Sequence, residues 1–195
     1  MLDWKTKASG VLLPADLALA LEDEHLRTIF EAVTAGRTSW SRMTPTREPS
    51  TDKPARCIIY TDGGARGNPG PAAAAGVIVG HDGAVLAEVT DYLGTTTNNV
   101  AEYKALIFTL RRALELGCAR IVVKMDSELV VKQLSGAYRV KDEKMIPLHA
   151  EVRRLLAQFE ERSVEHISRT ANKHADKLVN AVLDARDAAM REAAQ

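Results

Sequence analysis

Four acidic residues stand where predicted strands end or predicted helices begin. Asp62 follows the short β-rich run 56–61 (RCIIYT), and Asp126 follows a second such run, 120–125 (RIVVKM). Glu102 falls in the first turn of a helix predicted over 98–116, and Asp176 lies near the start of a helix predicted over 171–189. Ligand sites in open α/β sheets lie beyond the carboxyl ends of the strands, so the four carboxylates are expected to converge if the two strands are neighbours.

Such a cluster would favour divalent cations. Carboxylates brought together repel one another, and their burial is costly without positive charge. Oxygen ligands are hard and suit Mg²⁺, with Mn²⁺ as a substitute, rather than Zn²⁺. Two such ions roughly 3.5–4 Å apart can clamp the attacking water and the leaving oxygen of a phosphodiester. The sequence therefore allows a two-metal hydrolase.

Each acid also has a simpler interpretation. An Asp before Gly-Gly is often a turn residue, which would account for Asp62. Glu102 would favour the helix dipole, and Asp126 would cap the following helix. Asp176 would be a solvated helical acid. Each simpler interpretation is the better one for its residue alone, but four acids at matched positions favour a joint function.

The remaining pattern predicts an α/β fold with a mixed sheet flanked by helices. Apolar and β-branched runs predict strands over 56–61, 72–80, 84–94, 120–125 and 163–167, and helical periodicity predicts helices over 98–116, 127–134, 146–161 and 171–189. This order suggests an antiparallel start followed by helix-linked strands. The glycine-rich segment 63–71 (GGARGNPGP) fits neither phosphate-binding glycine motif and is interpreted as a turn between strands.

The first 55 residues differ from the rest of the chain in composition and in hydrophobic pattern. Leu19, Leu26, Ile29, Phe30 and Val33 form one apolar stripe and predict a helix from Pro14 to about Ala35. Segment 38–54 is rich in Ser, Thr and Pro and is typical of a linker. We therefore divide the chain into an N-terminal helical extension (1–37), a linker (38–55) and a catalytic domain (56–190). The extension is expected to dock on the domain or to mediate self-association, because its apolar stripe needs burial.

Composition sets weaker limits on function. The 195 residues include 26 basic and 26 acidic side chains, so any basic patch for nucleic acid must be local. Cys57 and Cys118 lie beside apolar runs without Cys or His neighbours, which predicts two separate buried thiols in a reducing compartment. Neither a signal peptide nor a run of membrane-spanning length is recognisable, so a cytoplasmic protein without membrane association is expected.

Four motifs, in this order, resemble those of the ribonuclease H family, type 1. They are YTDGGARGNPGPAAAAG (60–76), TTNNVAEYKAL (96–106), KMDSELVVKQLSGAY (124–138) and ISRTANKHADKLVNAV (167–182). The likeness covers about residues 56–185 and is greatest to the compact branch found in many bacteria and archaea. It implies a ribonuclease H-like fold, a five-stranded mixed sheet with helices on both faces.

The resemblance also implies an activity and a set of contacts. The four carboxylates would hold two Mg²⁺ ions, and a metal-bound water would cut the RNA strand of an RNA–DNA hybrid, leaving 3′-hydroxyl and 5′-phosphate ends. The glycine-rich turn matches residues that read RNA 2′-hydroxyls. Segment 97–99 matches residues near the DNA-strand phosphate and the hybrid backbone in the minor groove. The implied substrate contacts are Gly63, Gly64, Asn68, Thr97, Asn98 and Asn99.

Three departures from the larger relatives bear on this interpretation. A mobile loop with a catalytic His before the last Asp is missing, and His174 is interpreted as a surface residue. Arg169 is the better candidate for a contact with the phosphate. The basic, Trp-bearing protrusion is replaced by residues 138–145 (YRVKDEKM), which predicts weak hybrid binding. Glu128 stands where some relatives use Gln to contact RNA.

Two further functions stay open at this point. One is a broader nuclease of the same fold that also cuts double-stranded RNA or RNA–DNA junctions, favoured by the missing protrusion. The other is a nucleic-acid binding module without catalysis, supported only by the zero net charge. A dinucleotide enzyme, suggested by the glycines, is disfavoured because no helix directly follows them. The oligomeric state is not indicated by the sequence.

Overall fold

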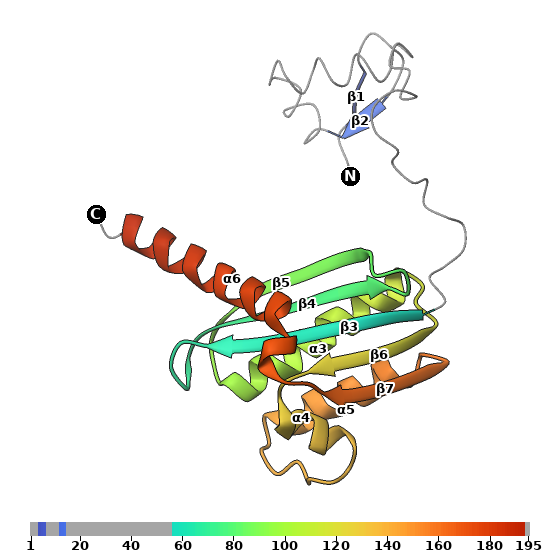
Figure 1. Ribbon diagram of the computed structural model, residues 1–195. Coiled ribbons are helices and arrows are strands. Elements are labelled where there is room, and N and C mark those ends of the chain that lie inside the picture. The colour runs from blue at the N-terminus through green and yellow to red at the C-terminus, as the bar shows by residue number, and fades with distance from the viewer. Residues whose placement is uncertain (1–3, 7–11, 15–55, 194–195) are drawn as a thin grey trace. The chain divides into compact units, whose positions relative to one another are not determined.

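The computed structural model describes residues 4–6, 12–14 and 56–193 (Figure 1). The chain divides into two compact units, 1–49 and 50–195. In the first, β1 (Trp4–Thr6) pairs antiparallel with β2 (Leu12–Pro14), a strand pair that the sequence analysis did not predict. The predicted N-terminal helix and the linker lie outside the described residues, except for Pro14, which belongs to β2. The role of the extension stays a prediction.

A five-stranded mixed sheet forms the centre of the second unit. Its strands are β3 (Arg56–Ala65), β4 (Gly70–Gly80), β5 (Val85–Thr96), β6 (Arg120–Met125) and β7 (Glu161–His166), in the order β5-β4-β3-β6-β7. β4 is antiparallel to β3 and β5, whereas β6 is parallel to both β3 and β7. The predicted antiparallel start and helix-linked parallel continuation are confirmed.

Helices cover both faces of this sheet. They are α3 (Asn98–Glu115), α4 (Glu128–Leu134), α5 (Met145–Leu156) and α6 (Lys173–Glu192), and the short 3-10 helix η2 (Arg169–Ala171) precedes α6. α3 packs on β3 and β4 from one side and contacts α5, which lies on the same side behind β7, while α6 crosses β3 and β4 on the opposite side (Figure 1). Helix α5 ends at Leu156 rather than at the predicted residue 161, because the chain turns there into β7.

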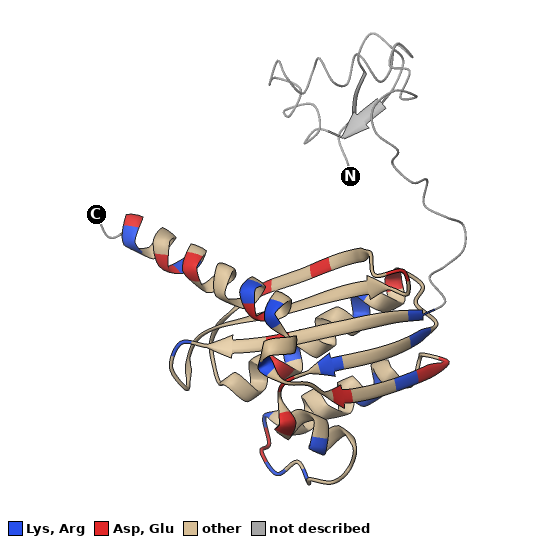
Figure 2. Ribbon diagram, viewed as in Figure 1, with Lys and Arg blue, Asp and Glu red and all other residues tan. Residues whose placement is uncertain are grey.

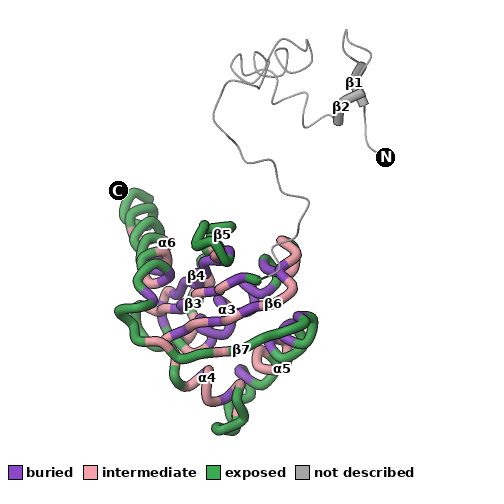
Figure 3. The backbone as a smooth tube through the Cα atoms, turned by 45° about the vertical axis from the view of Figure 1, so that its right-hand side comes forward, coloured by how far each residue is buried: buried purple, intermediate pink, exposed green. Residues whose placement is uncertain are grey.

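Two clusters of buried apolar side chains hold the layers together. Figure 3 shows that the buried residues lie along the central strands and the helices that face them. The larger one lies between the sheet and α3, and includes Tyr103, Leu106 and Leu110 of that helix. The smaller one joins Ala73 and Ala75 of β4 to Val179 and Leu183 of α6. Alternate residues of a strand point to opposite faces, so the alanine run of β4 lets helices approach closely from both sides. This close packing sets the height of α3 and α6 above the sheet.

Cys57 and Cys118 form a disulfide, and the prediction of two separate buried thiols is therefore wrong. Cys57 lies near the start of β3, and Cys118 follows the end of α3, where the chain turns back into β6 beside β3. Their Cα atoms are 6.0 Å apart although 61 positions separate them in the sequence. Only the tertiary fold brings the two side chains together. The cysteines therefore give no support to the predicted reducing compartment.

Within the described parts of the chain, no helix combines the length and the apolar character needed to cross a membrane.

Candidate active site

Asp62 and Asp126 lie side by side because of how β3 and β6 pair. The parallel ladder between these strands ends at Thr61 opposite Met125, and an aspartate follows on each strand. Asp62 does not end its strand, contrary to the prediction. β3 continues to Ala65 because its antiparallel partner β4 runs further, with Asp62 opposite Ala75. Gly63 and Gly64 consequently belong to the strand, and the turn between β3 and β4 is confined to residues 66–69.

Gly63 brings the third acid into place. A Cβ atom at Gly63 would lie 2.2 Å from both the carbonyl carbon of Ala101 and the backbone nitrogen of Glu102, so the backbone of α3 rests directly on β3. On the opposite face, a Cβ at Gly64 would lie 2.8 Å from Cγ1 of Val179 in α6. The two glycines thus let both helices reach the strand beside Asp62. Packing therefore accounts for glycine at both positions, whatever their part in substrate binding.

Glu102 lies in the second turn of α3 rather than in the predicted first turn. The helix begins at Asn98 and is capped by Thr97, whose Oγ1 accepts a hydrogen bond of 3.4 Å from the backbone N–H of Val100. The helix dipole acts mainly at the first turn, so it gives a poor account of this buried glutamate. Its position beside Asp62 and Asp126, where a shared cation would offset the three negative charges, gives a better one.

Asp62, Glu102 and Asp126 form one carboxylate cluster. Each offers one oxygen, and the three oxygens lie within 4.8 Å of one another. Asp62 is 9% exposed and Glu102 5%, while Asp126 is half-buried. Oε2 of Glu102 is buried without a hydrogen-bond partner in the described part of the chain. Three acids this close, with one orphaned oxygen, have the chemistry of a cation site.

Burial makes negative charge costly in this cluster. Loss of hydration, followed by repulsion from Asp126 and Asp176, raises the pKa of Asp62 from 3.8 to about 6. Loss of hydration is also the main reason why the pKa of Glu102 lies well above its ordinary value, and Asp62 and Asp126 add to it. The backbone N–H of Gly63 lowers both pKa values. A bound divalent cation would favour the ionised forms of both groups.

Comparison with known proteins places this arrangement in a family. A family model described as "Reverse transcriptase-like" matches residues 60–182. The chain is 44% identical over 133 residues to ribonuclease HI of Halobacterium salinarum, covering 68% of this chain and 67% of the relative. The chain belongs to the ribonuclease H family. It is also 44% identical over 140 residues to a bifunctional protein of Mycobacterium tuberculosis, but the match spans only 38% of that longer protein and 71% of this chain.

Solved structures of the ribonuclease H family share the fold. The crystal structure of ribonuclease H1 from Halobacterium salinarum matches with a TM-score of 0.65 and 44% identity, covering 66% of this chain and 98% of that one. The crystal structure of a ribonuclease H1 named LC11, in complex with an RNA/DNA hybrid, matches with a TM-score of 0.61 and 43% identity, covering 64% of this chain and 94% of that one. The predicted ribonuclease H-like fold is confirmed.

Asp176, the fourth of the predicted acids, stands beside the cluster rather than within it. Its Oδ1 accepts a hydrogen bond of 2.8 Å from Arg169, and its Oδ2 accepts one of 3.2 Å from Asn180. Asp176 raises the pKa of Asp62 and Arg169 lowers it, so both charges are near enough to act on the cluster. Arg169 is 78% exposed in its side chain. Its guanidinium thus partly offsets the acids at the mouth of the site.

Asn172 is a site residue that the sequence analysis missed. It is 1% exposed, and its Nδ2 donates to Oδ1 of Asp126 and to the backbone carbonyl of Thr61, each at 2.9 Å. An Asn immediately before a helix is a common N-cap, but the Asn172 side chain makes no capping bond to α6. The only sequence signal was its place four residues before Asp176, which does not distinguish a positioning residue from a cap.

The two predicted substrate-contacting asparagines with resolved contacts hold the β3–β4 turn against α3. The side-chain carbonyl of Asn68 accepts the backbone N–H of Asn98, and Oδ1 of Asn98 accepts the backbone N–H of Ala65, each at 3.2 Å. Asn68 and Asn98 are exposed and Asn99 is half-buried. This arrangement brings the turn and the start of α3 together at one edge of the site. Their contact with substrate stays a proposal.

The same turn is also tied to α6. Arg66 of the turn forms ion pairs with Asp184 and Asp187 of that helix, along which acidic and basic residues alternate (Figure 2). His174, interpreted from the sequence as a surface residue, is exposed and contacts Oε1 of Glu88 in β5 through Nε2 at 2.6 Å. Glu128, the unexpected acid at the start of α4, pairs with Lys132 at 2.6 Å, so its charge is partly balanced.

Proposed function

We propose that this protein is an endoribonuclease that hydrolyses the RNA strand of RNA–DNA hybrids and leaves 3′-hydroxyl and 5′-phosphate ends. The observation that carries the proposal is the buried cluster of Asp62, Glu102 and Asp126, with three oxygens within 4.8 Å. Support comes from the relative called ribonuclease HI and from the LC11 structure, which holds an RNA/DNA hybrid. Residues 56–190 are proposed as the catalytic domain, in agreement with the family match to 60–182.

The donor set fits divalent cations with hard ligands. Asp62, Glu102, Asp126 and Asp176 are the residues proposed to hold two Mg²⁺ ions, with Mn²⁺ as a substitute. Oε2 of Glu102 supports this assignment, because among residues 4–6, 12–14 and 56–193 it finds no partner for the hydrogen bond that a buried oxygen normally has. When bound, the metal supplies the positive charge that activates water and stabilises the phosphoryl oxygens.

The chain's own residues divide the remaining work. Asn172 holds Asp126 in one orientation through a hydrogen bond of 2.9 Å. Arg169, at the mouth of the site, is proposed to contact the substrate phosphate. The proposed RNA contacts are the backbone of Gly63 and Gly64 and the side chain of Asn68. Thr97, Asn98 and Asn99 are proposed to contact the backbone of the hybrid.

The decisive test is cleavage of a labelled RNA–DNA hybrid beside matched RNA–RNA and DNA–DNA duplexes, with Mg²⁺, Mn²⁺ or EDTA. We expect metal-dependent cutting of the hybrid's RNA strand alone, and a loss of about 10³-fold or more in the variant Asp126→Asn. Equal cutting of the RNA–RNA duplex would favour the alternative of a broader nuclease that also cuts double-stranded RNA. Hybrid binding without cleavage in either metal would identify a binding module instead.

A further inference from the structure

Arg66 joins the β3–β4 turn, which carries the proposed RNA contact Asn68, to helix α6. One terminal nitrogen of its guanidinium donates to Oδ1 of Asp184, and the other donates to Oδ2 of Asp187. The two acids stand three positions apart on α6, which places them on one face of the helix. A single side chain of the turn therefore contacts two successive turns of α6.

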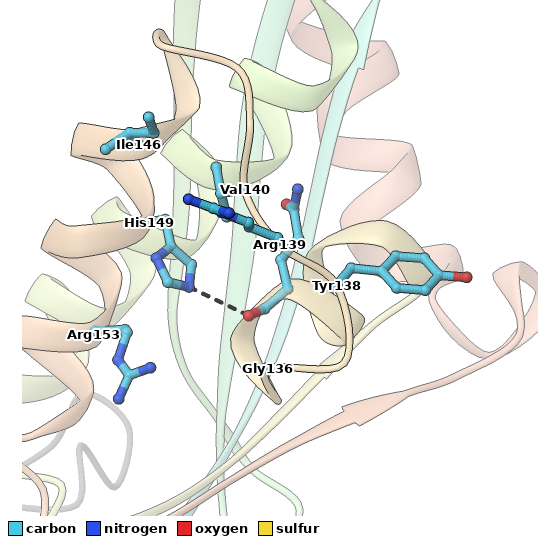
Figure 4. Close-up of a pocket in the computed structure, with 8 residues that line it drawn as sticks. Gly136, Tyr138, Arg139, Val140, Ile146, His149 and Arg153 are labelled. Carbon is cyan, nitrogen blue, oxygen red and sulfur yellow. Dashed lines mark hydrogen bonds between the residues drawn. The ribbon is translucent and has the colours of Figure 1, made fainter.

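This guanidinium is not an open site for a phosphate, because two carboxylates already bind it. One positive and two negative charges leave the group with a net charge of minus one, so a phosphate beside it would be repelled. Arg139 and Arg153 differ in this respect. They line a pocket of about 420 Å³ beside α5, and none of the described residues that line it is acidic (Figure 4). Arg66 is thus better suited to hold the turn in place than to bind substrate.

The turn is tightly closed, so a restraint on Arg66 also acts on Asn68. The backbone N–H of Arg66 donates to the carbonyl of Pro71 at 2.8 Å. A Cβ atom at Gly70 would lie 2.1 Å from the carbonyl oxygen of Arg66, so the two ends of the turn pack directly on each other. Asn68 lies two residues after Arg66, within the segment that these contacts close.

The turn is held from both faces of the sheet. On the α3 side, the side-chain carbonyl of Asn68 accepts the backbone N–H of Asn98, and Oδ1 of Asn98 accepts the backbone N–H of Ala65, each at 3.2 Å. On the α6 side, Arg66 is bound to a helix that packs on the sheet through buried residues such as Leu183. Loss of the Arg66 ion pairs would leave the turn attached to α3 alone.

We propose that Arg66, through Asp184 and Asp187, positions the β3–β4 turn for its contact with the RNA strand. Arg66 is a positioning residue, because it acts through Asn68 rather than on the substrate. The inference rests on the proposed function, in which Asn68 contacts RNA. Ordering a turn when a ligand binds costs conformational entropy, and a turn that is already held incurs less of this cost. Arg66 thereby contributes to the preference for a hybrid over a duplex that lacks RNA.

The expected signature is a change in specificity. The Arg66→Gln variant should raise KM for the hybrid on the order of fivefold and leave kcat per folded molecule nearly unchanged. The ratio of the Kd for a DNA–DNA duplex to the Kd for the hybrid should fall by a similar factor. A general loss of positive charge weakens the binding of both duplexes through their phosphates, so it largely cancels in this ratio.

The test measures both Kd values with fluorescein-labelled duplexes of the same sequence. Each substitution is placed in the full chain, with Asp126→Asn added to prevent cleavage. The same substitutions without Asp126→Asn supply kcat and KM, and melting temperatures give the folded fraction. The variants are Arg66→Gln, the double variant Asp184→Ala, Asp187→Ala, and the combination of all three substitutions.

Arg112→Gln is the matched control. Arg112 is also an exposed arginine in an ion pair, with Glu115 at 3.0 Å, but it lies in the last turn of α3, far along that helix from Asn98. Its replacement removes the same charge without touching the β3–β4 turn. The ratio of the two Kd values should therefore equal that of the unmodified residue.

The inference is supported if Arg66→Gln and the double aspartate variant lower the Kd ratio alike, and if the triple variant lowers it no further. It is overturned if the ratio stays constant, because any change in Kd would then reflect net charge or stability alone. It is also overturned if the arginine and aspartate effects simply add. Hybrid cleavage by the unmodified chain leaves the proposed function intact in both cases. If that chain neither binds nor cuts the hybrid, the proposed function and this inference fail together.

Discussion

Asn172 and Asp126 are joined by a hydrogen bond of 2.9 Å, although 46 positions separate them in the sequence. The same Nδ2 donates to the carbonyl of Thr61 at 2.9 Å, so a single buried amide links the segment before α6 to the middle of β3 and to the residue that follows β6. Oδ1 of Asn172 is buried without a partner in the described part of the chain. The amide is therefore held mainly by its two donated bonds, one of which reaches the proposed metal ligand Asp126.

Replacement of Asn172 by Ala is expected to lower hybrid cleavage about 10–100-fold, as for other residues that orient metal ligands. It should also raise the metal concentration needed for half-maximal activity, because Asp126 loses its fixed orientation. Loss of the buried donors should cost roughly 1–3 kcal/mol of folding free energy. Metal titration of activity, corrected for the folded fraction, separates the two effects.

The exposed variant Gln158→Ala serves as the control, since within the described residues its side-chain amide bonds to the carbonyl of Arg154 alone. A metal requirement in Asn172→Ala equal to that of the unmodified chain would leave Asn172 with a purely structural role.

Local sequence patterns predicted the elements well but not their exact pairing. The apolar periodicity of 98–116 and the run 120–125 gave α3 and β6 nearly to the residue, because both signals are local. The place of Asp62 inside β3 was missed because it depends on how far β4 runs beside that strand. Side-chain periodicity within 56–65 contains no information on the length of its partner.

For the site, too, local sequence patterns predicted the residues but not all of their long-range contacts. The sequence predicted that four carboxylates converge, and the structure brings one oxygen each of Asp62, Glu102 and Asp126 within 4.8 Å of one another. The position of Asp176 beside the cluster was not predicted, and there its carboxylate accepts hydrogen bonds from Arg169 and Asn180. The tertiary fold also brings Cys57 and Cys118 together in a disulfide, which no local motif predicted.

The raised pKa of Asp62 predicts an unusual pH dependence of stability without metal. Because the folded state binds this proton more tightly, the contribution of Asp62 to the free energy of unfolding falls as pH rises from about 4 to about 6. Each pKa unit is worth about 1.4 kcal/mol, so the loss approaches about 3 kcal/mol. In EDTA, the Asp62→Asn variant should therefore gain stability over the unmodified chain at pH 7 but not at pH 4.

Added Mg²⁺ should reverse this effect by favouring the ionised carboxylates. The melting temperature of the unmodified chain is expected to rise with Mg²⁺ more at pH 7 than at pH 5, and that of Asp62→Asn to rise less. Calorimetry across pH, with and without EDTA, gives both comparisons. An Asp62→Asn variant that is less stable than the unmodified chain at pH 7 in EDTA would show that the charged Asp62 carboxylate does not destabilise the fold.

The disulfide predicts a large effect of reduction. Closing a loop of 61 residues stabilises a fold by at most about 4 kcal/mol in the chain-entropy model. The double variant Cys57→Ala, Cys118→Ala and the dithiothreitol-treated chain should therefore both melt at a lower temperature. Thiol titration of the unfolded, unreduced chain should find no free thiol. Two titratable thiols in material purified without reductant would restore the prediction of separate buried cysteines.

Arg169 is expected to lower the pKa of Asp62 through its positive charge rather than through packing contacts. Its guanidinium lowers the pKa of Asp62 and pairs with Asp176 at 2.8 Å, while most of its surface is exposed. The Arg169→Gln variant should therefore raise the pKa of Asp62, followed by ¹³C carboxyl NMR in EDTA. Lys177→Gln removes the same charge one residue after Asp176 but does not contribute to the pKa of Asp62, so it should leave that pKa unchanged.

The same two variants show whether the effect on kcat/KM comes from the Arg169 side chain itself or from the loss of one positive charge near the site. If Arg169 contacts the substrate phosphate as proposed, Arg169→Gln should lower kcat/KM on the order of tenfold, whereas Lys177→Gln should have little effect. Because loss of Arg169 also frees Asp176, the double variant Arg169→Gln, Asp176→Asn completes a mutant cycle. Purely additive effects on kcat/KM would argue that the ion pair between the two residues has no part in catalysis.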